Sequence, residues 1–377
     1  MAEPSIALTE IIYTDASKYF DRILDAIQSA AHSIEMEVYL YHDDQIGTKI
    51  TQALCEAAKR GVTVKLLTDG VGICSNFHEI ADKLLSSGVQ VKIYRPLPWR
   101  FELWPLSRFP RKGILKLWHL MSYINQRNHR KLLVIDNLKV WLGSFNISQT
   151  HLSINQGGEN WRDTAIELTG IDTRNLGTAF NACWFKYSKR STAGELSPSP
   201  FIFNFTRSLR LSARSGLLHR IKTAKERVWI TNAYFIPDTK LLNALVIASK
   251  NGADVRIVLP KQSDIFFIPW ASSYFYSHLL DAGIRLYEYH NGVLHTKTVL
   301  IDHWGSVGSS NLNSRSLMHD LELDYSVQTE ESKRQLTHDF LDDLKKSEEL
   351  DQENWNQHRL WQRALGGLLL FLFGYWV

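Results

Sequence analysis

Residues 129–136 of the chain read His-Arg-Lys-Leu-Leu-Val-Ile-Asp, and residues 143–146 read Gly-Ser-Phe-Asn. The pattern occurs a second time, as His-Thr-Lys-Thr-Val-Leu-Ile-Asp at 295–302 and Gly-Ser-Ser-Asn at 308–311. A strand with a period of two residues places the His and Lys of each copy on one face. The Gly-Ser-x-Asn that follows is expected to bring a second strand back to the same place. Two such units predict one site at a pseudo-twofold interface.

The residue types in this pattern suit the chemistry of a phosphodiester. Lysine is a compact cation that binds phosphate oxygens, and Asn and Ser add neutral donors. Histidine titrates near neutral pH, so one copy can attack phosphorus while the other serves as acid and then as base. Because lysines and amides can stabilise the phosphoryl charge, this chemistry requires neither a metal nor a cofactor. The candidate catalytic residues are His129, Lys131, Asp136, His295, Lys297 and Asp302, and the candidate phosphate-binding residues are Asn146, Asn311, Ser144 and Ser309.

The pattern has two other interpretations, a structural histidine and a metal site. A single His-x-Lys would carry little information, because a lone histidine is usually structural, but two copies that share their residue types in order are hard to obtain by accident. A metal site is disfavoured because Cys55, Cys74 and Cys183 are scattered, and neither His-x-x-x-His nor Cys-x-x-Cys occurs. We therefore predict that no metal is bound.

The paired motifs resemble those of the phospholipase D superfamily, and most of the chain resembles bacterial cardiolipin synthases, above all the shorter branch that lacks two N-terminal membrane spans. Further matching stretches are Arg60-Gly61-Val62 ahead of a strand ending at Asp69, Asn160-Trp161-Arg162-Asp163, Asn232-Ala233-Tyr234-Phe235, and Arg315-Ser316 with Glu322. The resemblance implies an α/β fold of two pseudo-twofold-related phospholipase D-like lobes. Each lobe would be a mixed β-sheet flanked by helices, with one active site at their interface.

The resemblance also implies roles for individual residues. His129 would be the nucleophile and His295 the general acid and then base, although the symmetry of the motifs leaves this order open. Glu322 would orient His129 and Asp163 would orient His295, each acid reaching across the interface. We expect the motif aspartates, Asp136 and Asp302, to be structural partners in ion pairs with a nearby Arg or Lys.

The implied reaction is a phosphatidyl transfer. One phosphatidylglycerol would give its phosphatidyl group to a histidine and release glycerol, and a second would accept the group to form cardiolipin. Phosphatidylethanolamine is another candidate donor, and attack by water would make the protein a phospholipase D instead. A nuclease is an alternative from another class, but the net charge of +4 is modest and the C-terminus is apolar, so we expect no nucleic-acid partner.

An internal duplication supports two lobes independently of any family. Strands and helices are expected to alternate from residue 11 to 94, and the same order returns from 217 to 289. In the first half the expected strands are 11–13, 33–40, 62–67 and 89–94. The expected helices are one that Asp15 caps and two more at 50–59 and 80–85. In the second half the expected strands are 228–231, 255–259 and 284–289, and the expected helices are 217–224, 240–249 and 271–280.

The two halves differ just before their motifs. From Tyr94 to His129 is 35 positions, whereas from Tyr289 to His295 is six, so the first half carries about 29 extra residues. This insert, about 96–128, mixes tryptophans with arginines and lysines, which suits the headgroup region of an anionic bilayer. Its alternative is a basic surface loop whose aromatic residues fold back onto the protein.

The predicted organisation is a first lobe at 1–187, a linker at 188–200 rich in Ser and Pro, a second lobe at 201–350 and a tail at 351–377. The apolar end of the tail is too short to span a bilayer as an ordinary helix, so we expect an interfacial or half-inserted anchor, or else docking on the protein's own core. Few cysteines and no signal peptide favour a reducing compartment. We therefore expect a peripheral or tail-anchored protein at the cytoplasmic face of the bacterial inner membrane.

Overall fold

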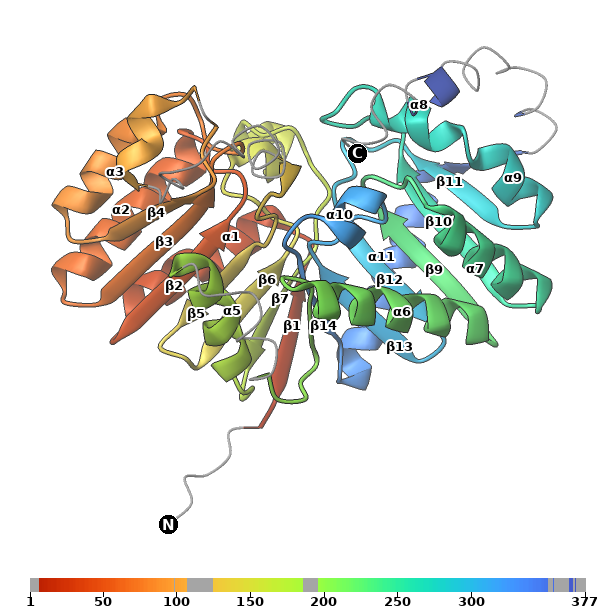
Figure 1. Cartoon of the computed structure of the whole chain (residues 1–377), viewed down its shortest axis with the longest axis horizontal. Coiled ribbons are helices and arrows are strands. Elements are labelled where there is room, and N and C mark those ends of the chain that lie inside the picture. Colours follow the sequence, from red (N-terminus) through yellow and green to blue (C-terminus); the bar gives the residue numbers. More distant parts are fainter. Residues whose placement is uncertain are drawn as a thin grey trace, which may run out of the picture.

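The computed structural model describes residues 7–97, 99–106, 125–185, 196–351, 355, 366–368 and 370. Two β-sheets stand side by side, each flanked by helices, and form the two lobes of the molecule (Figure 1). This confirms the predicted α/β fold of two lobes with mixed sheets.

The sheet of the first lobe has seven strands in the order β1-β7-β6-β5-β2-β3-β4. Strands β2, β3 and β4 are parallel, and the remaining pairs are antiparallel. The strands are β1 (Thr9–Tyr13), β2 (Ser33–Val38), β3 (Thr63–Asp69), β4 (Gln90–Tyr94), β5 (Leu132–Ile135), β6 (Lys139–Gly143) and β7 (Ala165–Thr169). The helices are α1 (Ala16–Ser29), α2 (Gln45–Lys59), α3 (Phe77–Ser86) and α5 (Arg174–Trp184), with short 3-10 turns η1 (Phe101–Leu106), η2 (Gln149–His151) and η3 (Ile154–Gln156).

The sheet of the second lobe has the order β15-β11-β10-β9-β12-β13-β14-β8. The strands are β8 (Phe201–Phe203), β9 (Arg227–Asn232), β10 (Asp254–Pro260), β11 (Arg285–Tyr289), β12 (Lys297–Ile301), β13 (Trp304–Gly308), β14 (Leu323–Ser326) and β15 (Ser347–Glu349). The helices are α6 (Arg207–Thr223), α7 (Thr239–Lys250), α8 (Ile268–Ser273), α9 (Tyr276–Asp281), α10 (Ser314–Met318) and α11 (Glu330–Lys345).

The duplication predicted from the sequence is visible in the strand order. Apart from the added edge strand β15, the second sheet repeats the first, with β8 in the place of β1 and β12 in the place of β5. The turns before equivalent strands match as well. Gly61 and Gly252 have φ of 93° and 91°, a left-handed conformation that glycine adopts without a steric penalty.

Most predicted elements lie within a few residues of the observed ones, and three differ. Helix α2 begins five residues before the predicted start, because the Asp44 side chain caps it by accepting from the amides of Ile46 and Gly47. The predicted helix at 271–280 is two short helices, α8 and α9. Helix α6 begins ten residues earlier than predicted, and its arginine-rich first turns bury no side chain.

The two lobes share a hydrophobic core. One cluster of buried side chains combines Leu132, Ile166 and Leu168 of the first sheet with Val307 and Tyr325 of the second. Hydrogen bonds also join the two lobes. The Glu10 carboxylate of β1 accepts from the Tyr325 hydroxyl at 2.7 Å and from two amides just before α11. The lobes are therefore packed as one body.

The predicted insert, linker and tail lie largely outside the described residues. Residues 107–124 of the insert and 186–195 at the linker are not described. In the tail, Trp355 is buried against Tyr276, and residues 366–367 lie against Trp270 and Tyr274 of the α8–α9 region. These contacts match the docking alternative for the described part of the tail. Over the described residues, we find no helix with the length and hydropathy needed to cross a bilayer.

Candidate active site

The two histidine segments cross the interface in the same way. The Asn128 segment forms a bridge to Leu321 of the second lobe, and the His129 amide donates to the Leu321 carbonyl at 2.9 Å. Reciprocally, Leu294 forms a bridge to Arg162 of the first lobe, and the His295 amide donates to the Arg162 carbonyl at 2.9 Å. Each histidine is thus held by a backbone segment of the opposite lobe, just before strand β14 or β7.

The residue after each bridging partner is an acid, and it contacts the histidine across the interface. His129 Nδ1 lies 3.2 Å from Glu322 Oε2, and His295 Nδ1 lies 2.8 Å from Asp163 Oδ1. All four side chains are buried. The two pairs proposed from the resemblance are therefore in contact. In each, Nδ1 faces the acid, which leaves Nε2 as the other ring nitrogen for a substrate.

The Asp163 carboxylate has a second histidine partner that the sequence analysis did not single out. His151 Nδ1 lies 2.8 Å from Asp163 Oδ2, and His151 Nε2 accepts from the Asn146 amide at 3.2 Å. The imidazole is buried between Phe145 and Trp161. His151 stands five residues after Asn146, and Ser316 stands five after Asn311 in the second copy. That equal spacing was the only available signal, and the differing residue types concealed it.

Burial and charge separate the two acids. Burial raises the pKa of Glu322 to about 7, against the opposing effect of Lys131 and its hydrogen bond with Ser309. Burial also opposes ionisation of Asp163, but the two neighbouring histidines, His295 and His151, outweigh it and hold its pKa well below the usual value. Asp163 is therefore an anion at neutral pH, whereas burial favours the protonated form of Glu322 more strongly.

The histidines differ accordingly. Burial lowers the pKa of His129 well below 6.5, and the charges of Lys131 and Lys297 lower it further. Burial and Lys297 also lower the pKa of His295, but the Asp163 anion opposes the shift. His129 is thus the more strongly held in the neutral form, and His295 is the better placed to carry a proton.

Both lysines are buried beside an aromatic ring. Lys131 Nζ donates to the His129 carbonyl at 2.7 Å and lies 5.3 Å from the centre of the Tyr39 ring. Lys297 Nζ makes the same two contacts, with the His295 carbonyl and with the Tyr234 ring. Burial lowers the pKa of Lys131 to about 7 and that of Lys297 to about 8. A bound phosphodiester anion would favour the protonated form of both amines.

The serines of the two Gly-Ser-x-Asn turns bond within the protein. Ser144 Oγ donates to the Thr164 carbonyl at 3.2 Å, and Ser309 Oγ donates to Glu322 Oε2 at 2.6 Å. These contacts tie each turn to the segment that carries the acid. They favour a positioning role for Ser144 and Ser309 over phosphate binding, for which we predicted them as second candidates after the asparagines.

The asparagines of the same turns are buried at the site. Asn146 Oδ1 accepts from the Leu40 amide at 3.2 Å, so this contact fixes the side chain without using its NH₂ group. The Asn311 amide oxygen has no partner within the described part of the chain. Both therefore fit the predicted phosphate-binding role, which needs an amide donor.

The motif aspartates lie apart from the histidine–acid pairs. We predicted that they form ion pairs with Arg or Lys, but among the described residues their carboxylates bind backbone amides instead. The Asp136 carboxylate accepts from three consecutive amides, Ala31, His32 and Ser33, at 2.7–2.9 Å. Asp302 accepts in the same way from the amides of residues 225–227. Both aspartates, at φ of 53° and 49°, end the histidine strand and hold the start of the neighbouring strand. These contacts favour a structural role.

Comparisons with known proteins agree with this geometry. A family model described as "Cardiolipin synthase, PLD-like domain" matches residues 23–160 and 217–344. Curated relatives include a cardiolipin synthase of Geobacillus sp., 30% identical over 94% of this chain and 70% of that protein. Cardiolipin synthase 2 of Bacillus cereus is 31% identical over 93% and 68%, and a cardiolipin synthase of Clostridium perfringens is 32% identical over 93% and 74%.

Solved structures support the fold. A phosphatidylserine synthase of Haemophilus influenzae superposes with a TM-score of 0.70 over 97% of this chain and 94% of that one, at 12% identity. A polyphosphate kinase of Porphyromonas gingivalis gives a TM-score of 0.60 over 89% and 50%, also at 12% identity. With the two-part family match, the relatives and the paired site, the chain belongs to the cardiolipin synthase, PLD-like domain family, within the phosphatidyltransferases of the phospholipase D superfamily.

Proposed function

We propose that the protein is a cardiolipin synthase that works through a covalent phosphohistidine. His129 Nε2 would attack the phosphorus of a donor phospholipid, and the bond from phosphorus to the headgroup oxygen would break. His295 would give its proton to that oxygen, releasing glycerol when the donor is phosphatidylglycerol. The hydroxyl of an acceptor phosphatidylglycerol would then lose its proton to His295 and attack phosphorus, and cleavage of the N–P bond would free His129.

One observation carries the division of roles between the histidines. Asp163 remains an anion beside His295, whereas burial and two lysines hold His129 in the neutral form. A nucleophile needs a free lone pair, and a general acid needs a proton that a neighbouring anion stabilises. Glu322 and Asp163 would orient the two imidazoles through Nδ1. Lys131, Lys297 and the Asn146 and Asn311 amides would stabilise the phosphoryl oxygens.

The membrane surface is the proposed partner, and exposed aromatic side chains support it. In the first lobe Trp99 and Phe101 are 63% and 66% exposed, and in the second lobe Phe266 is 76% exposed. Large exposed aromatic residues are suited to the interface of a bilayer. With lipid substrates, they support peripheral attachment at the cytoplasmic face of the bacterial inner membrane.

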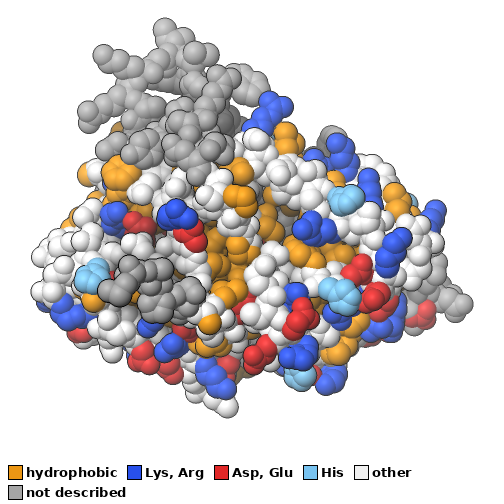
Figure 2. All heavy atoms as spheres, turned by 90° about the horizontal axis from the view of Figure 1, so that it is seen from below, with side chains coloured by type: hydrophobic (Ala, Val, Ile, Leu, Met, Phe, Trp, Pro, Cys, Tyr) orange, Lys and Arg blue, Asp and Glu red, His pale blue; other side chains and the backbone are white. Residues whose placement is uncertain are grey.

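A nuclease remains the alternative from another class, and the face drawn in Figure 2 does not favour it. On the face drawn in Figure 2, lysines and arginines alternate with aspartates and glutamates around a group of hydrophobic side chains. A channel for a nucleic acid would instead present a continuous basic band with stacking aromatic residues. Hydrolysis to phosphatidic acid is the other outcome, if water replaces the acceptor lipid.

The test is turnover of vesicles that contain labelled phosphatidylglycerol, with products resolved by mass spectrometry. We expect cardiolipin and glycerol from the natural chain and a loss of at least about 10³-fold in both His129→Ala and His295→Ala. His295→Ala should accumulate a phosphatidyl-histidine at residue 129, and the protein should float with the vesicles. Phosphatidic acid as the only product would establish a phospholipase D, and cleavage of oligonucleotides without lipid turnover would establish the nuclease.

A further inference from the structure

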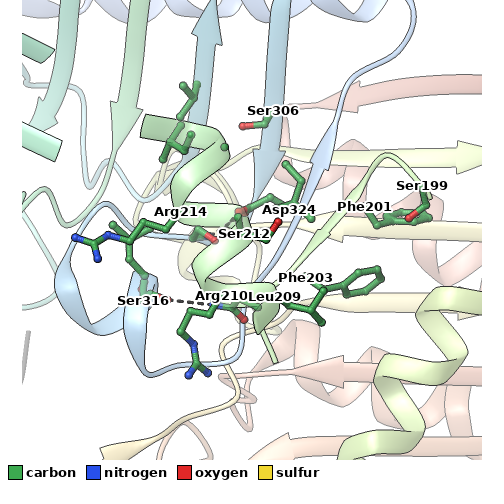
Figure 3. A pocket seen from close by; sticks show the side chains of 18 of the residues that line it. Ser199, Phe201, Phe203, Leu209, Arg210, Ser212, Arg214, Ser306, Ser316 and Asp324 are labelled. Atoms are coloured by element: carbon green, nitrogen blue, oxygen red, sulfur yellow. Dashed lines mark hydrogen bonds between the residues drawn. The ribbon is translucent and has the colours of Figure 1, made fainter. Parts of the chain in front are cut away.

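A cavity of about 570 Å³ lies between helix α6 and the sheet of the second lobe. Its volume is within the range of small-molecule sites. The catalytic Lys297 is among its lining residues, as are Ser310 of the second Gly-Ser-x-Asn turn and Asp324 of β14. Figure 3 shows α6 crossing in front of these strands, with Phe201 and Phe203 on one side and Arg210 and Arg214 on the other.

The equivalent place in the first lobe can be identified from the motif aspartates. Asp136 binds the amides of residues 31–33 at the end of α1, and Asp302 binds those of 225–227 at the end of α6. The two sequences therefore align with a constant offset of 194 (225 minus 31), which places Ala213 at the position of Tyr19 and Arg214 at that of Phe20.

The first lobe is filled with aromatic rings at these positions. Tyr19 stacks on Phe145 with ring centres 4.5 Å apart, Phe20 meets the same ring edge-on, and Trp141 is fully buried in the same cluster. In the second lobe, strand register places Ser306 at the position of Trp141, and the repeated turn places Ser310 at that of Phe145. Four large side chains are replaced by Ala, Arg and two Ser, and a cavity remains.

The cavity is also chemically unlike a packing defect. Asp324 stands where the first lobe has Ala165, and its carboxylate accepts from Ser310 Oγ at 2.5 Å and from the Ser310 amide at 3.1 Å. Both side chains are half-buried rather than sealed in the core. A carboxylate and a hydroxyl side by side suit hydroxyl groups of a ligand.

Arg210 supplies a cationic group whose acidic neighbour, Asp320, is near enough to raise the pKa of the guanidinium against the lowering effect of burial, but is not paired with it. Arg214 pairs with Asp238, and Arg220 stacks on Trp304, whereas the Arg210 guanidinium makes no ion pair with any described residue. It donates to the His319 carbonyl at 3.1 Å, and its Nε is buried without a hydrogen-bond partner. A half-buried guanidinium in this state is suited to an anionic oxygen of a ligand.

We propose that this cavity binds the headgroup of the acceptor phospholipid, with its phosphate at Arg210 and its glycerol hydroxyls at Asp324 and Ser310. The inference rests on the transfer reaction proposed above, and it places the acceptor lipid of that reaction in the cavity under α6. A polyol phosphate fits the lining better than an acyl chain does, because an acyl chain would take the Asp324 carboxylate and the Arg210 guanidinium out of water and offer neither of them a polar contact. Occupancy beside Lys297 would bring a hydroxyl to the phosphohistidine and exclude water from it.

The test compares transfer with hydrolysis in full-length variants, using vesicles of labelled phosphatidylglycerol. Arg210→Gln removes the charge, Arg210→Lys keeps it, and Ala213→Phe restores a ring found in the first lobe. Arg207→Gln and Ser208→Phe are matched controls at exposed positions of α6 that do not line the cavity. For each variant, the ratio of cardiolipin to phosphatidic acid and the total lipid consumed are measured, with thermal unfolding as the check on folding.

We expect Arg210→Gln and Ala213→Phe to lower the ratio by about tenfold or more, while total consumption changes by less than about threefold. Arg210→Lys should recover most of the ratio, and both controls should match the natural chain. An unchanged ratio in folded Arg210→Gln, or an equal loss of both products, would overturn the assignment. If Ala213→Phe fails to fold, the comparison of Arg210→Gln with Arg210→Lys is sufficient to test the assignment of the cavity. Lack of lipid turnover by the natural chain would overturn the proposed function itself.

Discussion

At the scale of single residues, the site separates two chemically identical histidines by their surroundings. His129 faces an acid whose pKa is about 7, whereas His295 faces Asp163, which His151 helps to keep ionised. The asymmetry needs no difference in the motifs themselves. It arises because the acid beside His295 is Asp163 whereas the acid beside His129 is Glu322, and because the first lobe has His151 where the second has Ser316.

These pKa values predict an optimum on the acidic side of neutrality. Lys131 and Lys297 have pKa values of about 7 and about 8, and His295 titrates below 6.5, so all three lose the proton they need as pH rises. His129 must be neutral, and its lowered pKa keeps it so below pH 6.5. We expect kcat/KM to fall by roughly tenfold or more from pH 7 to pH 9, as initial rates on vesicles would show.

Binding to vesicles, followed by flotation over the same pH range, is the control for that profile. It distinguishes loss of catalysis from loss of membrane attachment. A kcat/KM that is constant or rises between pH 7 and pH 9 would contradict the assigned protonation states.

At the scale of elements, each motif aspartate joins the end of one strand to the start of its neighbour. Replacing Asp136 by Ala leaves three amides at the start of β2 without their acceptor. We expect a loss of about 1–2 kcal/mol in the free energy of unfolding, measured by denaturant titration, with kcat nearly unchanged. Backbone hydrogen bonds outweigh burial and lower the pKa of Asp136, so this contribution is present at neutral pH and is lost as pH falls below about 4.

Asp302→Ala should reproduce the effect in the second lobe, because its carboxylate makes equivalent contacts. Asp25→Ala, at an exposed position of α1, is the control and should change stability by less than about 0.5 kcal/mol. A loss of kcat as large as that of His129→Ala, with unchanged stability, would show that the aspartate is catalytic after all.

At the scale of the whole molecule, the lobes share one core and are joined by isolated backbone bridges at the site. Leu132 and Ile166 pack in one cluster with Val307 and Tyr325, and Glu10 bonds across to the second lobe. We therefore expect a single cooperative thermal transition by calorimetry, with equal calorimetric and van't Hoff enthalpies. Two resolved transitions would mean that the lobes fold as separate domains.

The sequence was most informative where a pattern was repeated. The two copies of the motif predicted the lobes and the shared interface, because equal spacing in a duplicated fold puts equal residues in equal places. The two acids, Asp163 and Glu322, were predicted only from the resemblance to a family, since they stand at different distances from their motifs. The sequence failed at His151, whose contact with Asp163 depends on tertiary packing, and at whose equivalent position the second copy has a different residue type, Ser316. It also missed the start of α6, because a helix that covers a cavity lacks the apolar stripe from which helices are recognised.

The exchange of acids between lobes has a consequence for ancestry. A lone lobe of this design carries a histidine and an acid that cannot reach each other, so an unduplicated forebear would have worked only as a pair of identical chains. In such a homodimer both subunits have the same sequence, so they cannot differ in their packing residues. Two lobes in one chain are free of that constraint, so one half can be packed with Tyr19 and Phe145 while the other is hollow around Ser310.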